Sequence, residues 1–219
     1  MNPFFITGIG TGVGKTLAAA IVAEALGAYY WKPVQAGFDE GTDAQWVGAR
    51  LSNSERVLPE AYMLKLPASP HIAAREEGML IRVEDIAAQL PAVRPLVVEG
   101  AGGLLVPLND REFMADLALR LDATVILVSR NYLGSINHSL LTAEVCRMRG
   151  VKVAGWIFND QYGHYEQEIA EWSGLPVLGS VPFAPSPDRE FVRAQAARLR
   201  PNLMYLYERH PGAVETDEF

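Results

Sequence analysis

Residues 4–16 read Phe4-Phe5-Ile6-Thr7-Gly8-Ile9-Gly10-Thr11-Gly12-Val13-Gly14-Lys15-Thr16. The apolar run from Pro3 to Ile6 predicts a strand, and the alanine-rich segment from Leu17 to Leu26 predicts a helix. The glycines therefore lie in the connecting loop, where their tolerance of positive φ and their missing Cβ let successive backbone N–H groups face one anion. A strand, a glycine loop and a helix in this order are typical of a phosphate-binding loop.

The residues of this loop also predict how a nucleotide would be bound. The helix N-terminus adds unpaired N–H donors and a partial positive charge. Lys15 would reach the β- and γ-phosphates, and the Thr16 hydroxyl would ligate Mg²⁺. The loop is a variant one residue longer than the ordinary pattern, which has a glycine at the position of Ile9. We predict nucleotide contacts along the loop and the start of the helix, at Gly12, Val13, Gly14, Lys15, Thr16 and Leu17.

Composition limits the class of protein. A chain of 219 residues with 49% hydrophobic and 21% charged residues predicts one soluble α/β domain over residues 1–219. The net charge of −7 argues against a nucleic-acid partner. Cys146 is the one cysteine, so no internal disulfide can form, which fits a reducing compartment. With no signal-peptide pattern and no apolar stretch near the ~20 residues of a membrane helix, we expect a cytoplasmic protein without a membrane partner.

Strands alternate with helices along the rest of the chain. The apolar patterns predict strands at 28–34, 95–99, 124–129, 151–158 and 177–181, and helices at 43–51, 83–90, 111–121, 135–149, 164–173 and 188–199. Residues 53–82 are the least regular, and we expect residues 202–219 to form a loosely held tail. Strands that are apolar throughout indicate an α/β fold with three layers, a doubly wound and mainly parallel sheet carrying the variant P-loop.

Ligands of such sheets bind beyond the C-terminal ends of the strands. Glu99 ends an apolar strand just before Gly100, Ala101 and Gly102, where its carboxylate could reach Mg²⁺ as the acid of a Walker-B-like strand does. A glutamate that merely enters solvent is the alternative. Asp43 is explained equally well as a helix cap, for which Thr42 also qualifies. Lys32 could be a solvated end residue, although its strand is expected beside the first one.

Two later segments allow both a functional and a structural interpretation. Asn159 and Asp160 follow a strand, and an asparagine could read an adenine edge, but a simple turn explains them too. Leu133-Gly134-Ser135-Ile136-Asn137 precedes a helix whose N–H groups could hold a carboxylate, although Ser135 as an ordinary N-cap is sufficient. The four histidines have no metal spacing, and no Ser–His–Asp set or cysteine-based site is evident.

Seven blocks in order resemble one family, the dethiobiotin synthetases, and the likeness runs from about residue 4 to about residue 190. The blocks are Gly-Thr-Gly-Val-Gly-Lys-Thr (10–16), Lys-Pro-Val-Gln-Ala-Gly (32–37), Thr-Asp-Ala (42–44), Ser-Pro-His (69–71), Val-Glu-Gly-Ala-Gly-Gly (98–103), Leu-Gly-Ser-Ile-Asn-His (133–138) and Asn-Asp (159–160). The longer loop is also a feature of that family.

The resemblance implies a cyclo-ligase of biotin biosynthesis that joins CO₂ to 7,8-diaminononanoate with MgATP. The diamine forms a carbamate, ATP converts it to a carbamic–phosphoric anhydride, and the second amine closes the ring. The resemblance further implies catalytic Lys15 and Lys32, and a homodimer. It implies Mg²⁺ ligands at Thr16, Asp43 and Glu99. The nucleotide contacts it implies also include Gly100, Ala101, Gly102, Asn159, Asp160, Val181, Pro182 and Phe183. The substrate contacts it implies are Thr11, Lys32, Ala36, Gly134, Ser135, Ile136 and Asn137.

The chain departs from the family at two positions, and two rival functions remain. Some members have a glutamate in place of Gly12 and a serine in place of Ala36, which puts those contacts to the diamine in doubt. An amidating synthetase of the cobyrinate type normally brings a domain with a nucleophilic cysteine, but Cys146 lies within a predicted helix. A partitioning-type ATPase switch would have a second lysine in the loop, at the position of Gly10.

Overall fold

The computed structural model describes residues 2–160 and 165–209 of the chain. Within these residues a seven-stranded parallel sheet has the order β4-β2-β6-β1-β7-β8-β9, and two more parallel strands pair as β3-β5. The strands are β1 (Phe4–Gly8), β2 (Tyr29–Trp31), β3 (Val34–Ala36), β4 (Val57–Leu58), β5 (Tyr62–Leu64), β6 (Leu96–Gly103), β7 (Thr124–Arg130), β8 (Val153–Asn159) and β9 (Val177–Val181).

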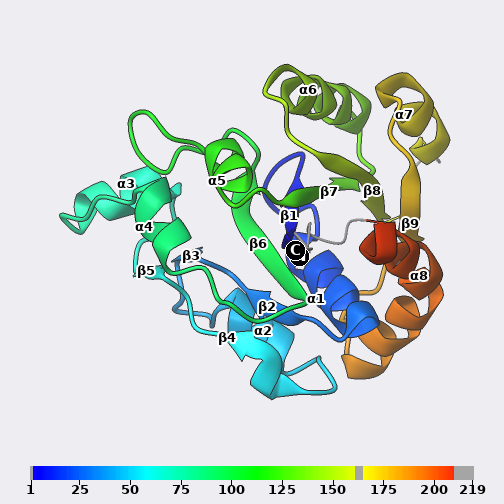
Figure 1. Cartoon of the computed structure of the whole chain (residues 1–219), viewed down its shortest axis with the longest axis horizontal. Helices are drawn as coiled ribbons and strands as arrows, with labels where there is room; N and C mark the ends of the chain where they lie inside the picture. The colour runs from blue at the N-terminus through cyan, green and yellow to red at the C-terminus, as the bar shows by residue number, and fades with distance from the viewer. Residues whose placement is uncertain (1, 161–164, 210–219) are drawn as a thin grey trace, which may run out of the picture.

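Helices cover both faces of the main sheet (Figure 1). One face is packed by α1 (Lys15–Leu26), α2 (Asp43–Gly48) and α8 (Arg189–Arg209). The other is packed by α3 (Pro70–Glu76), α4 (Val83–Ala88), α5 (Met114–Arg120), α6 (Ser135–Met148) and α7 (Glu166–Ser173). The predicted fold class, a three-layer doubly wound α/β fold with a parallel sheet, is confirmed.

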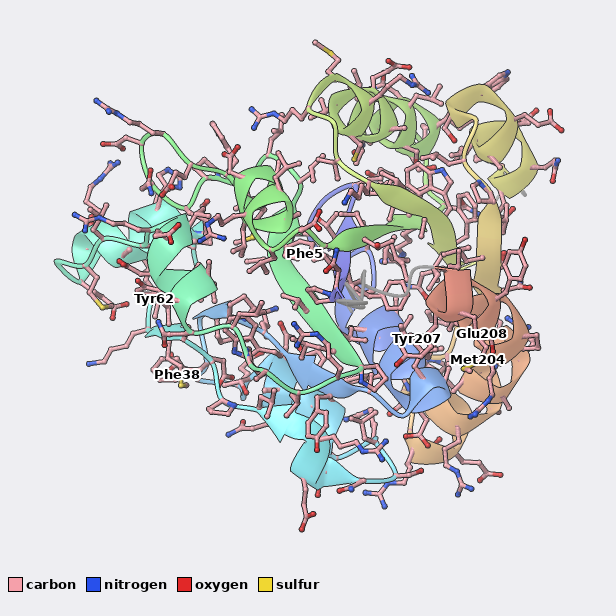
Figure 2. All side chains as sticks on the ribbon, viewed as in Figure 1. Phe5, Phe38, Tyr62, Met204, Tyr207 and Glu208 are labelled. Atoms are coloured by element: carbon pink, nitrogen blue, oxygen red, sulfur yellow. The ribbon has the colours of Figure 1, made fainter. Side chains whose placement is uncertain are left out.

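The central strand β1 separates two hydrophobic cores. Phe5 points into the core beneath α5 and α6, whereas Phe4 and Ile6 point toward α1 and α8. Figure 2 shows Phe5 near the middle of the sheet and Tyr207 on α8, close to α1. Full burial of a side chain such as Phe5 stabilises the folded state by about 1.5–3 kcal/mol. These alternating residues therefore fix β1, and with it the loop that follows, in the centre of the molecule.

The predicted strand over 28–34 is shorter and interrupted. β2 ends at Trp31, and after Lys32 and Pro33 the chain enters β3, which pairs with β5 rather than with the main sheet. Proline has no N–H to donate to a ladder, so the main sheet cannot continue through Pro33. Residues 53–82, which have no clear periodicity, contain β4, β5 and α3.

The last described helix is longer than predicted. α8 continues through Pro201 to Arg209, and Leu203 is fully buried against the core beneath α1. Asn202 donates a side-chain hydrogen bond to the Leu178 carbonyl, 3.0 Å away. This packing outweighs the helix-breaking effect of an internal proline. The prediction of a loosely held tail is therefore wrong for residues 202–209, and residues 210–219 lie outside the described part.

Other boundaries shift by a few residues. β6 continues past Glu99 to Gly103, and α6 ends at Met148 ahead of Gly150, whose φ of 68° fits its predicted place after the helix. α7 begins at Glu166, and His164, the predicted start, lies outside the described residues. None of the described helices has the length and apolar character that a membrane span requires.

Candidate active site

The glycine loop joins β1 to α1 at the C-terminal edge of the sheet. Gly14 has φ 92° and stands at the N-cap of α1, and Gly12 has φ 72°, so both use a conformation that a side chain would strain. The ammonium of Lys15 donates to the Gly10 carbonyl at 2.8 Å. Burial lowers the pKa of Lys15 to about 8, with Lys32 adding to the effect against the opposing carboxylates. This lysine would regain a charge partner if a phosphate entered the loop.

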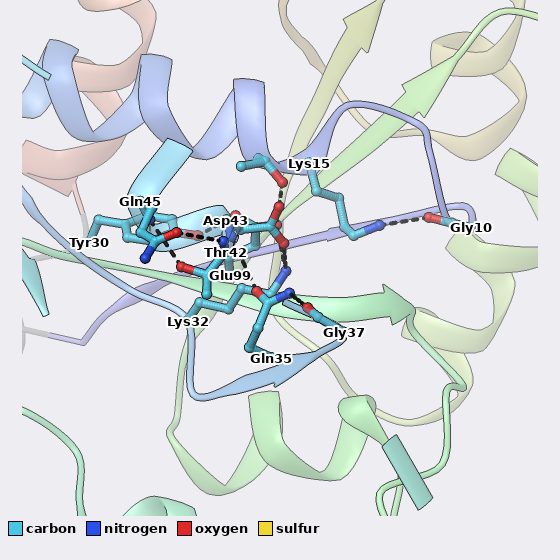
Figure 3. Close-up of polar contacts among 11 residues, drawn as sticks. Gly10, Lys15, Tyr30, Lys32, Gln35, Gly37, Thr42, Asp43, Gln45 and Glu99 are labelled. Atoms are coloured by element: carbon cyan, nitrogen blue, oxygen red, sulfur yellow. Dashed lines mark hydrogen bonds and ion pairs between the residues drawn. The ribbon is translucent and has the colours of Figure 1, made fainter. Parts of the chain in front are cut away.

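Glu99 is the centre of a buried group of polar side chains. Its carboxylate is 1% exposed and accepts hydrogen bonds from three donors. Oε1 accepts from the Thr16 hydroxyl at 2.8 Å and from the Lys32 ammonium at 3.2 Å, and Oε2 accepts from the Tyr30 hydroxyl at 2.7 Å. Asp43 accepts a second bond from Lys32. We call Thr16, Tyr30, Lys32, Asp43 and Glu99 the carboxylate cluster, most of which can be followed in Figure 3.

Strand geometry explains why this cluster forms. In the parallel pair of β2 and β6, Tyr30 lies opposite Val97, and Glu99 is two residues further along β6 on the same face. Lys32 is likewise two residues beyond Tyr30. The period of two thus places a phenol and an ammonium on the α1 side of the sheet, one on each side of the Glu99 carboxylate.

Charge within the cluster fixes its protonation. Burial by itself would lower the pKa of Lys32, but Glu99 and Asp43 outweigh it, and the pKa is raised above 10.5. Burial, followed by the Glu99 charge, raises the pKa of Tyr30 well above 10. At neutral pH Lys32 is therefore a cation and Tyr30 is a neutral donor.

Asp43 is held by the start of α2. The Thr42 hydroxyl accepts from the Gln45 amide at 3.1 Å, and the Gln45 side chain accepts from the Thr42 amide at 3.0 Å. This reciprocal capping box identifies Thr42 as the cap. Gln35 on β3 accepts from the Asp43 amide at 3.3 Å and donates to the Gly37 carbonyl at 2.7 Å. The Asp43 carboxylate is thus free to pair with Lys32 and is not needed as the cap.

A cleft of about 750 Å³ opens over the loop and the cluster. Eleven of the residues predicted to form the site line it together: Thr11, Gly12, Gly14, Lys15, Thr16, Lys32, Ala36, Asp43, Glu99, Ala101 and Gly102. Val13, Leu17 and Gly100 adjoin these residues in sequence but are not part of the lining. The far wall comes from β3 and from the start of α3, with Gln35, Pro67, Ser69 and Pro70.

The oxygen atoms of the cluster are suitable ligands for a magnesium ion. Thr16, Asp43 and Glu99 supply the oxygen ligands that Mg²⁺ prefers. The Lys32 ammonium lies between both carboxylates, so a positive charge is already favoured there. No group of three or more His, Cys, Asp or Glu converges within residues 2–160 and 165–209. The chain would therefore supply two carboxylates and a hydroxyl and leave the other positions to water and phosphate, as is usual for Mg²⁺ beside nucleotides.

The residues predicted to hold the base lie at the ends of β8 and β9. Asn159 donates to the Val13 carbonyl at 3.1 Å, which joins β8 to the glycine loop. The Asp160 amide donates to the Val181 carbonyl at 2.9 Å, and the Asp160 carboxylate pairs with Arg130 at 3.1 Å. Phe183 is 64% exposed. We call Asn159, Asp160, Val181, Pro182 and Phe183 the base-side residues; none of them lines the cleft.

The predicted carboxylate-binding turn, Gly134–Asn137, begins α6 and also does not line the cleft. Gly134 has φ 103° and precedes the first helical residue, Ser135. Ser135 is fully buried, yet its hydroxyl has no hydrogen-bond partner among the described residues, and both side-chain atoms of the neighbouring Asn131 are likewise unpaired. Ser135 is therefore not the N-cap that the simpler interpretation requires. We call residues 134–137 the α6 turn.

Two side chains of the site do not stand out in the sequence. Tyr30 is one of several aromatic residues in its strand, although its position two residues before Lys32 already places both on one face. Gln35 stands in a quoted block without an assigned role. Neither position carries a local signal of chemistry, because a buried phenol and a buried amide become functional only through the partners that the fold provides.

Comparisons with known proteins show which proteins the chain is similar to. A family model described as AAA domain matches residues 2–190. The ATP-dependent dethiobiotin synthetase BioD of Cytophaga hutchinsonii is 47% identical over 206 residues, covering 92% of this chain and 98% of that protein. The enzyme of the same name from Christiangramia forsetii is 45% identical over 202 residues, covering 91% of this chain and 97% of that protein.

Solved structures with a similar fold are much more distant in sequence. The cell division ATPase MinD of Pyrococcus furiosus has a TM-score of 0.59 at 17% identity and covers 96% of this chain and 100% of its own. A ParA family ATPase from Chlorobium tepidum has a TM-score of 0.55 at 13% identity, over 93% of this chain and 96% of its own. These likenesses extend to the fold alone.

Proposed function

The chain belongs to the ATP-dependent dethiobiotin synthetase family, its activity is ATP-dependent dethiobiotin synthesis in biotin biosynthesis, and we propose that the cleft over the glycine loop carries out this reaction. The observation that supports the location is the convergence of Lys15, Lys32 and Glu99 on one cleft. Those residues come from three separate segments of the chain: Lys15 and Lys32 follow strands β1 and β2, and Glu99 lies within β6 of the same parallel sheet.

The proposed reaction has three steps. One amine of 7,8-diaminononanoate adds to CO₂ and loses a proton, which gives a carbamate. A carbamate oxygen attacks the γ-phosphorus of ATP, the bond to ADP breaks, and a carbamic–phosphoric anhydride results. The second amine attacks the carbonyl carbon, phosphate leaves, and loss of a proton completes the cyclic urea of dethiobiotin. ATP is consumed as a co-substrate.

The cleft suits the second step because an anion must approach a polyanion there. Lys15 and the backbone N–H groups of residues 12–17 would hold the β- and γ-phosphates. Lys32 remains charged at neutral pH and lines the same cleft as the loop, where it would neutralise the carbamate and the γ-phosphate. Fixed donors and charges of this kind supply most of the catalysis in phosphoryl transfer.

Mg²⁺ would be held by Thr16, Asp43 and Glu99. When bound, the ion supplies positive charge that offsets the charge of the phosphates. The Lys32 ammonium shares both carboxylates, so the same two groups that would bind the metal also orient the lysine.

The remaining contacts are assigned by resemblance to the family. We propose that the base-side residues, Asn159 foremost, hold the adenine. We also propose that the protein is a cytoplasmic homodimer, in which the α6 turn of one chain binds the diamine carboxylate over the cleft of the other. Two features support this arrangement: the α6 turn does not line the cleft of its own chain, and its buried Ser135 hydroxyl has no partner in the described part of the chain.

The rival functions are less well supported. An amidating synthetase would require a reactive cysteine, but Cys146 is buried in α6 and burial raises its pKa to about 12, which suppresses the thiolate. A partitioning-type switch would share the fold with the MinD and ParA proteins, yet Gly10 stands where its second loop lysine would be.

Phosphate release tests the proposal. We expect the purified protein with MgATP to release phosphate only when both bicarbonate and 7,8-diaminononanoate are present, with dethiobiotin formed in equal amount by mass spectrometry. DNA or anionic vesicles should have no effect. Phosphate release that needs neither co-substrate, or that DNA or vesicles stimulate, would favour the switch instead.

A further inference from the structure

Tyr30 donates its hydrogen bond to Glu99 from the core side of the site rather than from the cleft side. Tyr30 is fully buried and is not part of the cleft lining, whereas Glu99, Thr16 and Lys32 all line it. The phenol hydroxyl lies 2.7 Å from Oε2 of Glu99. The two oxygens of this carboxylate are therefore distinct: Oε2 faces the core, and Oε1 faces the residues of the cleft.

We propose that Tyr30 is a positioning residue that locks the Glu99 carboxylate so that Oε1 alone is presented to the metal. This inference rests on the proposed function, because it assigns Glu99 to Mg²⁺. Without Tyr30, Oε2 would be a buried oxygen with no donor, and the carboxylate would be free to turn about its last bond. Hydrogen-bond partners behind a metal ligand fix its orientation in this way.

The surroundings make Tyr30 the donor for Oε2. Both other hydrogen bonds to Glu99, from Thr16 and Lys32, go to Oε1. Tyr30 itself is fixed by its strand, because its neighbours on β4 and β6 are Val57 and Val97, which offer no side-chain hydrogen bond. The phenol hydroxyl is thus a polar group in an apolar layer, and it donates its hydrogen bond to one oxygen, Oε2 of Glu99.

The test is the variant Tyr30→Phe, which removes the hydroxyl and keeps the ring. Mn²⁺ is used as the probe, and its binding in the presence of ADP is measured by the loss of the free-ion EPR signal. We expect Mn²⁺ to bind 10- to 100-fold more weakly, the range found for partners behind metal ligands. The Mg²⁺ concentration for half-maximal activity should rise similarly, while KM for the diamine is unchanged.

Tyr29→Phe is the matched control. It makes the same chemical change on the same strand, at a half-buried residue whose neighbour on β6 is Leu96, and we expect Mn²⁺ binding within twofold of wild type. A second control combines Tyr30→Phe with Glu99→Gln. If Tyr30 acts through Glu99, Tyr30→Phe will cause no further loss of Mn²⁺ binding when Glu99→Gln is already present.

Each outcome decides the proposal. Wild-type Mn²⁺ binding by folded Tyr30→Phe would overturn it, and so would an equal loss in the Glu99→Gln background. If Tyr30→Phe does not fold, the double variant should, because it removes the buried charge together with its donor. A double variant that also fails to fold would show that the hydroxyl is needed by the fold independently of the Glu99 charge, and would overturn the proposal. Absence of Mn²⁺–ADP binding and of dethiobiotin synthesis in the wild type would instead contradict the proposed function.

Discussion

The carboxylate cluster and the α6 turn both lie at the C-terminal edge of the sheet, but only the cluster has its buried polar groups paired among the described residues. Each charged group of the cluster has a partner of opposite charge, and Glu99 accepts three hydrogen bonds. In the α6 turn and just before it, Ser135 and Asn131 bury polar atoms that have no protein partner among the described residues.

This difference separates two kinds of site. A network whose members are all satisfied holds its geometry before any ligand arrives, which is what phosphoryl transfer requires. Buried polar atoms without partners cost free energy, and a ligand or a second chain that supplies those partners recovers it. The cluster therefore fits the chemical step, and the α6 turn fits recognition of the substrate.

The largest effect should follow from removing the cation of the cluster. We expect Lys32→Met to lower turnover on the order of 10²-fold, equivalent to about 3 kcal/mol, because a preorganised charge at the transferred phosphoryl group is lost. Nucleotide binding should persist, because Lys15 and the loop amides remain. Steady-state dethiobiotin formation and ADP titration calorimetry measure the two quantities.

Lys152→Met is the control for that variant. Lys152 forms an exposed ion pair with Asp122, and such pairs contribute little. Its turnover should stay within twofold of wild type. Near-normal turnover in Lys32→Met itself would show that the cluster is structural, and the contrast with the α6 turn would lose its basis.

An intermediate effect is expected where β8 meets the glycine loop. Asn159→Ala removes the hydrogen bond to the Val13 carbonyl and should weaken ATP binding about tenfold, or ~1.4 kcal/mol, with kcat little changed. Asn202→Ala removes a bond of the same type, to the Leu178 carbonyl, at a distance from the cleft. It should lower the melting temperature without altering the ATP dissociation constant. Equal ATP affinity in both variants would contradict a nucleotide role for Asn159.

The smallest effects are expected at two serines of α6, and they distinguish a hydroxyl that binds a ligand from a hydroxyl that stabilises the fold. Ser135→Ala removes a hydroxyl that has no partner within residues 2–160 and 165–209, so the melting temperature should be unchanged or higher, while KM for the diamine rises several-fold. Ser139→Ala leaves Ser129 unpaired at a 2.9 Å contact and should cost about 1 kcal/mol of stability with KM unchanged. A loss of stability in Ser135→Ala with a normal KM would reverse this assignment.

The loop and most of the cluster could be predicted from the sequence because they lie near the C-terminal ends of strands of one parallel sheet. Lys32 and Glu99 end apolar runs, Lys15 and Thr16 follow the glycine loop after another such run, and parallel strands bring such ends together. The capping signal at Thr42 predicts where α2 starts, but only the family resemblance assigned Asp43 to the site.

Other features depend on tertiary packing that local patterns do not contain. Pro201 predicts a break, yet α8 continues because Leu203 is buried against the sheet. The role of Tyr30 could not be predicted from its type, because a strand tyrosine is usually a packing residue. The α6 turn cannot be related to the cleft from one chain alone, since its proposed partner belongs to a second copy.

Gly14 imposes a lasting constraint on how this site can change. A methyl group at Gly14 would collide with the side-chain amide of Asn159. The two positions are therefore coupled, because a residue with a side chain at position 14 requires a smaller or reoriented side chain at position 159. A lineage that replaced Asn159 would have to do so within the space that this glycine leaves.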